Sequence, residues 1–424
     1  MPLPPWVFLH RNVHFVDGEE FTGGGAGNAA ALAAIGKSSG DQASLEEVVA
    51  ALKPNPVVAG DPPEVASLSM VRHLPKHLMP RGIDDDGGTV SSTDKGLVVI
   101  YAGMYRPGHG LGTSAAVLRL RHGGGGGADD GAYVLAELVT TIYPGLPDAH
   151  LYLWSSSSNP DGGGGPWRRT AARLPLPAEL CGLTPLFHID MVFALGDSCV
   201  CWADLAAGVL ICDLFAPQGP EFSFVPLPPE CCSCSYTHEN TRRTPVPEEF
   251  RSMGCVCGAI KLVAMIGYSE GLPKAEVILK TWTLSSDFRE WKEGAAVLVR
   301  DLWESKSFRD KELPRGWPMN PVLSMNEDEI IYISLSDIEF VEDYDFYGQY
   351  TGRQLVLNGH YVLRLDLLRN EVLYSKKSTT NSLSLLRPIV LASDFSAYLH
   401  GRKDSQRGKE ASDEVGTTVK RTKY

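Results

Sequence analysis

Apolar residues along this chain occur in short alternating runs rather than in long stretches. The runs are rich in β-branched and aromatic residues and are bounded by Gly, Pro, Asp or Ser, which is the pattern of β-strands separated by turns. The clearest predicted strands are 6–10, 96–103, 116–121, 132–138, 150–154, 222–228, 275–284, 329–335 and 360–367. The pattern predicts an all-β protein with about 20 short strands.

Helical periodicity, with apolar residues repeating every three to four positions, is rare in this chain. It is found in 28–36, 45–53 and 300–308. We therefore expect a few short helices, two of them in the N-terminal portion.

Residues 199–215 read CVCWADLAAGVLICDLF and predict a hairpin that is buried on both faces. A period of two places Val200 and Trp202 on one face and cysteines on the other, so both faces are apolar. Residues 204–208 provide the turn, with Asp and Gly at its two ends. The side chains expected to be buried are Val200, Trp202, Leu210 and Ile211. The cysteines are interpreted as packing residues.

The same order of elements, a strand that ends in Asp, a turn and a return strand, recurs weakly elsewhere. It is seen again in 150–177, 275–299 and 322–377. Repeated units of this size bury their faces by stacking on their neighbours. We therefore expect a propeller-like array of about five to seven small antiparallel blades.

Residues 201–228, CWADLAAGVLICDLFAPQGPEFSFVPLP, resemble the hallmark of a plant family expanded in grasses, the domain of unknown function 1618. Segments 6–17, 251–265 and 278–291 are also similar to members of that family. The family has no established activity, so the resemblance implies no functional residues. A more distant likeness, to F-box-associated and kelch-type β-propellers, depends on the strand–Trp–Asp–strand pattern. Residues 1–60 do not show the helical pattern of an F-box.

The composition of successive segments predicts three parts of the chain. Residues 1–150 form an N-terminal β-rich part with glycine-rich loops and short helices, and 151–400 form the family core of propeller-like blades. Residues 401–424 are polar and charged, and we expect this tail to be disordered.

The net charge of −12, from 51 acidic and 39 basic residues, argues against binding to nucleic acid or to anionic membranes. No apolar run approaches the roughly 20 residues needed to cross a bilayer, and the first residues do not resemble a secretory signal. The nine cysteines are interpreted as reduced thiols. These features predict an intracellular protein of the cytoplasm, the nucleus or both.

The strongest candidate for chemistry is a set of thiol and imidazole groups of the kind that bind zinc. Its members are Cys232, Cys234, His238, Cys255 and Cys257. Structural zinc sites favour C-x2–4-C spacing, whereas two cysteines of an extended C-x-C lie about 6–7 Å apart on one strand face. We therefore assign no metal and no other cofactor, and leave zinc binding by these five residues open.

Residues 327–345 contain eight acidic residues and no basic ones. Such a segment is either a solvated surface or a docking surface for a basic partner. The chain contains no H-E-x-x-H pattern, and we assign no catalytic residue.

The leading hypothesis is a non-enzymatic scaffold that binds a protein through 327–345 or through loops on one face. One alternative is an adaptor that works with a separate F-box-bearing component of a ubiquitin ligase. The other is a metal-binding or hydrolytic enzyme with its site in the propeller channel. That enzyme would need convergent polar side chains with shifted pKa values in the channel.

Overall fold

The structure is a computed structural model, and it describes strands and short helices separated by undescribed segments. The described residues are 5–18, 51–57, 64–73, 88–102, 114–120, 132–140, 149–156, 166–180, 187–231, 246–269, 272–344, 347, 349–377 and 390–395. This part of the chain contains 23 β-strands and only two short α-helices. The strands coincide with the predicted apolar runs, so the predominantly β class is confirmed.

Four sheets follow one another along the chain, and each is an antiparallel meander of four strands. The first contains β7 (Ala115–Arg119), β8 (Tyr133–Thr140), β9 (Ala149–Ser155) and β10 (Arg168–Ala172). The second contains β11 (Met191–Leu195), β12 (Cys199–Asp204), β13 (Gly208–Asp213) and β14 (Glu221–Pro226). The third contains β15 (Arg251–Val256), β16 (Ala259–Ile266), β17 (Ile278–Leu284) and β18 (Trp291–Leu298). The fourth contains β19 (Trp317–Leu323), β20 (Ile330–Tyr344), β21 (Tyr350–Asp366) and β22 (Glu371–Lys377).

A fifth sheet joins the two ends of the described chain. Its order is β23-β1-β4-β2-β5-β6, and β3 pairs with β4. Its strands are β1 (Val7–His10), β2 (Asn12–Asp17), β3 (Leu52–Val57), β4 (Val65–Arg72), β5 (Gly88–Asp94), β6 (Leu97–Ala102) and β23 (Val390–Ser393). Because β23 pairs antiparallel with β1, the C-terminal strand closes onto the N-terminal one.

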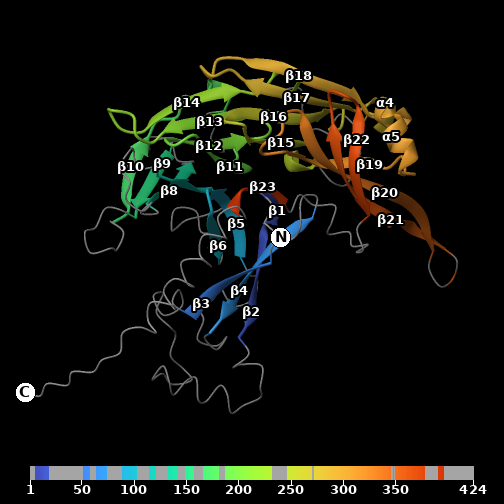
Figure 1. The fold of residues 1–424 in the computed structure, drawn as a ribbon, viewed down its shortest axis with the longest axis horizontal. Helices are drawn as coiled ribbons and strands as arrows, with labels where there is room; N and C mark the ends of the chain where they lie inside the picture. Colours follow the sequence, from blue (N-terminus) through green and yellow to red (C-terminus); the bar gives the residue numbers. More distant parts are fainter. Residues whose placement is uncertain are drawn as a thin grey trace, which may run out of the picture.

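The four meanders form an arc, and strands β1, β5 and β23 of the fifth sheet lie on its concave side (Figure 1). Apolar side chains fill the space between successive sheets of the arc. The second meander shows this best, since Trp202 packs toward the first meander and Ile211 packs with residues of the third. This stacking explains why strands with two apolar faces are stable here.

The fifth sheet contacts both ends of the arc. At one end, Ser92 Oγ donates a hydrogen bond to Ala115 O at 2.9 Å, which links β5 to β7. At the other end, the Phe8 ring of β1 packs edge-on against Tyr332 of β20, with ring centroids 4.8 Å apart. The expected count of five to seven blades stays a prediction.

The short helices α4 (Val299–Glu304) and α5 (Lys306–Asp310) confirm the helical prediction for 300–308. Ser305 caps α5 by accepting a hydrogen bond from the Phe308 amide. The helix predicted to extend through Lys53 is wrong at its end, because Leu52 begins β3 and pairs with Arg72 of β4.

Several predictions fall at or beyond the limits of the described residues. The predicted helix 28–36 and the tail 401–424 lie outside them. The domain division expected at residue 150 falls within β9, one strand of the first meander. No described helix has the length and apolar character needed to cross a membrane.

Candidate functional site

The cysteine-rich hairpin is a structural element. Strands β12 and β13 pair from Cys199↔Asp213 to Asp204↔Gly208, as the pattern predicts. The four side chains expected to be buried are all at most 3 % exposed: Val200, Trp202, Leu210 and Ile211. The indole of Trp202 donates a hydrogen bond to Ser114 O at 2.8 Å, so its one polar atom is satisfied inside the core.

The thiols of this hairpin are packed and not activated. Burial raises the pKa of Cys201 well above its ordinary value, and it raises the pKa of Cys212 to about 12. A thiolate is the nucleophilic and metal-binding form of cysteine, and these sites disfavour it. The interpretation of the cysteines as packing residues agrees with this environment.

Aspartates at strand ends hold the turns, as the recurring sequence pattern suggests. Asp204 accepts hydrogen bonds from the amides of Ala206 and Ala207 in the turn, and from the His188 amide at 2.6 Å. Asp366 accepts a bond from the Arg369 amide at the end of β21 in the same way. A buried carboxylate with several backbone donors is a structural device, and it explains the recurrence of Asp at these positions.

The five candidate zinc ligands are only partly described. Cys232, Cys234 and His238 lie outside the described residues. Cys255 is half-buried in β15, and burial raises its pKa. Cys257 lies in the two-residue turn before β16 with φ +49°, so the two thiols do not share one extended strand face. Among the residues that the structure describes, no group of three His, Cys, Asp or Glu side chains is placed to hold a metal ion.

The acidic segment 327–345 separates into two parts. Its first carboxylates are structural: Glu327 pairs with Arg364, and Asp328 and Glu329 pair with Lys261. Glu329 also accepts hydrogen bonds from Thr281 Oγ1 at 2.5 Å and from the Ala295 amide at 3.2 Å. This carboxylate therefore joins the third and fourth meanders, and the expectation that the whole segment is a solvated surface is wrong here.

The remaining part belongs to a projecting ribbon that we call the arm, residues 338–344 of β20 and 350–357 of β21. Strand β19 pairs with β20 as far as Ser336, and β22 pairs with β21 from Tyr361. Beyond these registers, among the described strands, β20 and β21 pair only with each other. Figure 1 shows the arm extending past the rest of the fourth meander.

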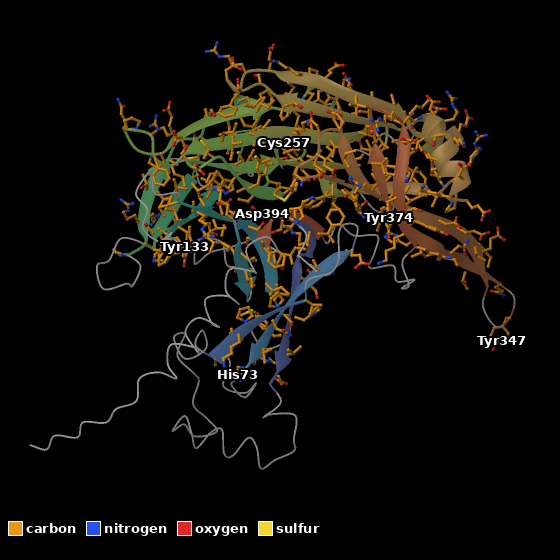
Figure 2. All side chains as sticks on the ribbon, viewed as in Figure 1. His73, Tyr133, Cys257, Tyr347, Tyr374 and Asp394 are labelled. Atoms are coloured by element: carbon orange, nitrogen blue, oxygen red, sulfur yellow. The ribbon has the colours of Figure 1, made fainter. Side chains whose placement is uncertain are left out.

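The arm exposes apolar and acidic side chains together. Val341 is 44 % exposed, Tyr350 is 59 % exposed and Tyr347 at the tip is 85 % exposed (Figure 2). Glu339 and Glu342 are also exposed on β20. At the base, Leu357 and Ile338 pack with Met319, so the arm is anchored where it leaves the sheet.

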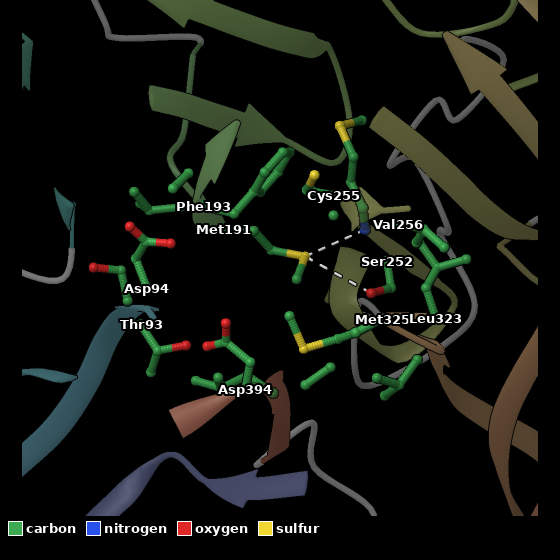
Figure 3. A pocket seen from close by; sticks show the side chains of 18 of the residues that line it. Thr93, Asp94, Met191, Phe193, Ser252, Cys255, Val256, Leu323, Met325 and Asp394 are labelled. Carbon is green, nitrogen blue, oxygen red and sulfur yellow. Dashed lines mark hydrogen bonds between the residues drawn. The ribbon is translucent and has the colours of Figure 1, made fainter. Parts of the chain in front are cut away.

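A second candidate is a cavity of about 480 Å³ between the arc and the fifth sheet, which we call the central cavity. It is lined by residues of β5, β11, β15 and β19 and by the segment 390–394. Figure 3 shows Asp94, Asp394, Met191, Phe193 and Met325 among its lining residues. Its volume, and its lining of apolar side chains with a few polar groups, are typical of pockets that bind small ligands.

Asp94 is fixed at the end of β5. Its Oδ2 accepts a hydrogen bond from the Arg119 amide at 2.7 Å, and Lys95 Nζ lies 3.7 Å away. Lys95 itself forms a closer ion pair with Asp197, at 2.9 Å. Burial raises the pKa of Asp94, and the neighbouring carboxylate of Asp394 raises it further.

Asp394 follows β23 and lines the same cavity. Burial raises its pKa, whereas backbone amides, including that of Lys95, favour its ionised form. No ion pair joins this carboxylate to a basic side chain of the described residues. Two carboxylates thus face one partly buried space.

A third group lies beside the cavity, where Arg11 of the β1–β2 junction approaches Asp190. Burial and the nearby carboxylate of Glu248 raise the pKa of Asp190 to about 7, although the Leu205 amide donates a hydrogen bond to it at 2.8 Å. Glu248 and Asp190 in turn favour the charged form of Arg11, against the effect of burial.

Cys255 and Cys257, two of the candidate zinc ligands, line this cavity, whereas its charged residues were not predicted from the sequence. Asp94 stands at a strand end before a Lys-Gly turn, so the strand–Asp–turn pattern could have identified it as a structural aspartate. Nothing in the sequence indicates that it shares a cavity with Asp394, because that arrangement depends on the pairing of β23 with β1.

Comparison with known proteins finds one family model that is similar to part of this chain. No curated protein matches the chain. The family model described as "Protein of unknown function (DUF1618)" matches residues 202–332, from Trp202 in β12 to Tyr332 in β20. Over this range, which includes the whole third meander, the chain is similar to the DUF1618 family, and the resemblance drawn from 201–228 is supported.

Proposed function

We propose that this protein is a non-enzymatic interaction scaffold, and that its arm captures an extended basic segment of a partner protein. The observation that carries the proposal is the continuation of β20 and β21 beyond both neighbouring strands. A two-stranded ribbon offers backbone donors and acceptors along its edges, to which a further strand can be added.

The chemistry of the arm supports a basic partner. By sequence, residues 338–357 contain four acidic residues and one basic residue. The exposed Val341 and Tyr350 supply apolar contacts beside these charges. A partner strand that alternates basic and apolar side chains complements both features, with charge setting orientation and association rate.

The test uses the full chain and a synthetic peptide of alternating lysine and valine, followed by fluorescence anisotropy. We expect saturable binding that weakens about tenfold when ionic strength rises from about 0.05 to 0.3 M, since exposed charges are screened. Charge reversal at Glu339 and Glu342 to lysine should abolish it.

Two controls make the result specific to strand addition. Asp287→Lys introduces a similar charge at an exposed position outside the arm and should leave binding unchanged. N-methylation of alternate peptide bonds removes the donors of one peptide edge and should abolish binding. Equal binding of a glutamate–valine peptide, or of the N-methylated peptide, would contradict the proposal.

The adaptor and enzyme hypotheses stay predictions. An adaptor requires ubiquitin-ligase components among the proteins that co-purify with the chain. The free cysteines of the described residues support action in a reducing, intracellular compartment.

We also propose that the five sheets are the blades of a β-propeller. Four meanders in chain order, apolar packing between successive sheets and a sheet shared by the two chain ends support this architecture. A ring closed by terminal strands leaves few exposed edges.

A further inference from the structure

The central cavity carries negative charge that local cations do not offset. Its lining includes the basic residues Arg11 and Lys95 and the acidic residues Asp94, Asp197 and Asp394. Lys95 is bound to Asp197 at 2.9 Å and to Gly196 O at 3.4 Å. Its ammonium group is therefore already coordinated at one edge of the cavity.

The positive charge of Arg11 is balanced by other carboxylates. Asp190 and Glu248 are the charges that favour its ionised form. Lys95 also lies 3.7 Å from Asp94, and its charge favours the ionised forms of Asp94 and Asp394. One ammonium group thus serves three carboxylates of the lining, which keeps an excess of negative charge at Asp94 and Asp394. They come from the end of β5 and the end of β23, two strands of the fifth sheet.

The apolar part of the lining is held in place. Met191 Sδ accepts hydrogen bonds from the Met253 amide at 3.4 Å and from Ser252 Oγ at 3.9 Å, as the dashed lines in Figure 3 show. Met325 and Phe193 lie beside it. Thioethers are polarisable and pack against apolar groups of varied shape.

We propose that the central cavity binds a small organic cation, with an ammonium group between Asp94 and Asp394 and an apolar body against Met191, Phe193 and Met325. The cavity measures about 480 Å³, which suits a ligand of modest size. Burial, which raises the pKa of both carboxyls, makes their charge costly until a cation arrives. A bound ammonium would therefore be stabilised by charge-assisted hydrogen bonds in a partly dry site.

The test compares hexylammonium, hexanol and hexanoate, which share one apolar body and differ in charge. Binding is followed through the methionine methyl signals of the 13C-methyl-labelled full chain, with Met191→Leu and Met325→Leu used for assignment. We expect hexylammonium to shift the Met191 and Met325 signals saturably. Hexanol should bind at least about tenfold more weakly, which is the loss expected for a charge-assisted contact.

Single variants Asp94→Asn and Asp394→Asn keep the shape of the site and should each weaken hexylammonium binding at least about tenfold. The control Asp287→Asn removes a carboxylate from an exposed turn and should leave it unchanged. Equal binding of hexanol would overturn the proposal in favour of a purely apolar cavity. Preferential binding of hexanoate would overturn it in favour of an anion site at Arg11, and unshifted Met191 and Met325 signals with all three probes would overturn it outright.

Discussion

Two hairpins of this protein start from similar sequence patterns and end in opposite environments. In the β12–β13 hairpin, CVCWAD and GVLICD, both faces are covered by neighbouring meanders. In the arm, IEFVED also contains β-branched and aromatic residues, but only three of its six residues are apolar, and Val341 is 44 % exposed. The difference lies in what stands beside each hairpin, because β19 and β22 stop before the arm begins.

Acidic residues have different roles inside the stacked meanders and on the arm, beyond the ends of β19 and β22. Asp204 and Glu329 are buried and accept several hydrogen bonds each. Glu339 on the arm is exposed and receives one bond, from Asn358 at 3.3 Å. Carboxylates inside the stacked meanders are therefore structural, whereas Glu339 on the arm faces solvent.

The largest expected effect is the difference in stability between a substitution in the buried hairpin and one in the arm. Trp202→Ala should lower the free energy of unfolding by about 3–5 kcal/mol, because it removes a fully buried ring and its bond to Ser114 O. Tyr347→Ala at the arm tip should change it by less than about 0.5 kcal/mol. Urea denaturation of both variants measures the contrast, and a similar loss for both would break the comparison.

The next effect concerns the junction of the third and fourth meanders, where Glu329 precedes β20. Glu329→Ala should cost about 2–4 kcal/mol, because Lys261 loses a buried partner and Thr281 loses its acceptor. The matched variant Glu339→Ala, at an exposed carboxylate of β20, should be nearly neutral. If thermal denaturation ranks the two variants in the reverse order, the division of the acidic segment is incorrect.

A smaller effect depends on pH and involves Asp190, which supports the turn of the buried hairpin through the Leu205 amide. Its folded pKa is raised to about 7, so its contribution to stability is present below its ordinary pKa and is lost as pH rises through 7. Asp190→Asn should therefore be more stable than the parent chain at pH 8 by on the order of 1–3 kcal/mol.

The same measurement contains its own control, since the advantage of Asp190→Asn should shrink toward pH 4, where Asp190 is protonated. Denaturant midpoints at pH 4, 6 and about 8 follow the difference. A constant difference across these values would show that Glu248 and burial do not perturb this carboxyl.

The smallest perturbation is chemical labelling of the native thiols. Cys257 is exposed in its turn and should react with N-ethylmaleimide first. Cys201 and Cys212 should stay unlabelled until the chain unfolds, because burial raises their pKa. Mass spectrometry of the labelled peptides reports each site, and early labelling of Cys201 would contradict the packed hairpin.

Much of the fold could be predicted because it depends on local pattern. The alternation in 199–215 was sufficient for the strands, the turn and the four buried side chains. The recurrence of Asp before turns predicted positions such as Asp204 and Asp366, whose carboxylates accept turn amides. The helical ending predicted for 45–53 was wrong because pairing with β4 outweighs the helical preference of two residues.

The candidate sites could not be predicted to the same extent. The acidic segment was recognised, but the pairing of its first carboxylates depends on Lys261 and Arg364, which are far away in sequence. The charged lining of the central cavity was missed, since Asp94 and Asp394 are separated by 300 positions and reach one cavity through the closing pair of β23 and β1.

The amino-acid sequence by itself determined the strands, the turns between them and the apolar character of their faces, because these depend on neighbours within a few residues. Tertiary structure decided which faces are covered, which carboxylates are paired and where two of them share a cavity. Those outcomes depend on where β19 and β22 end beside β20 and β21, and on the pairing of β23 with β1. No short stretch of sequence encodes either feature.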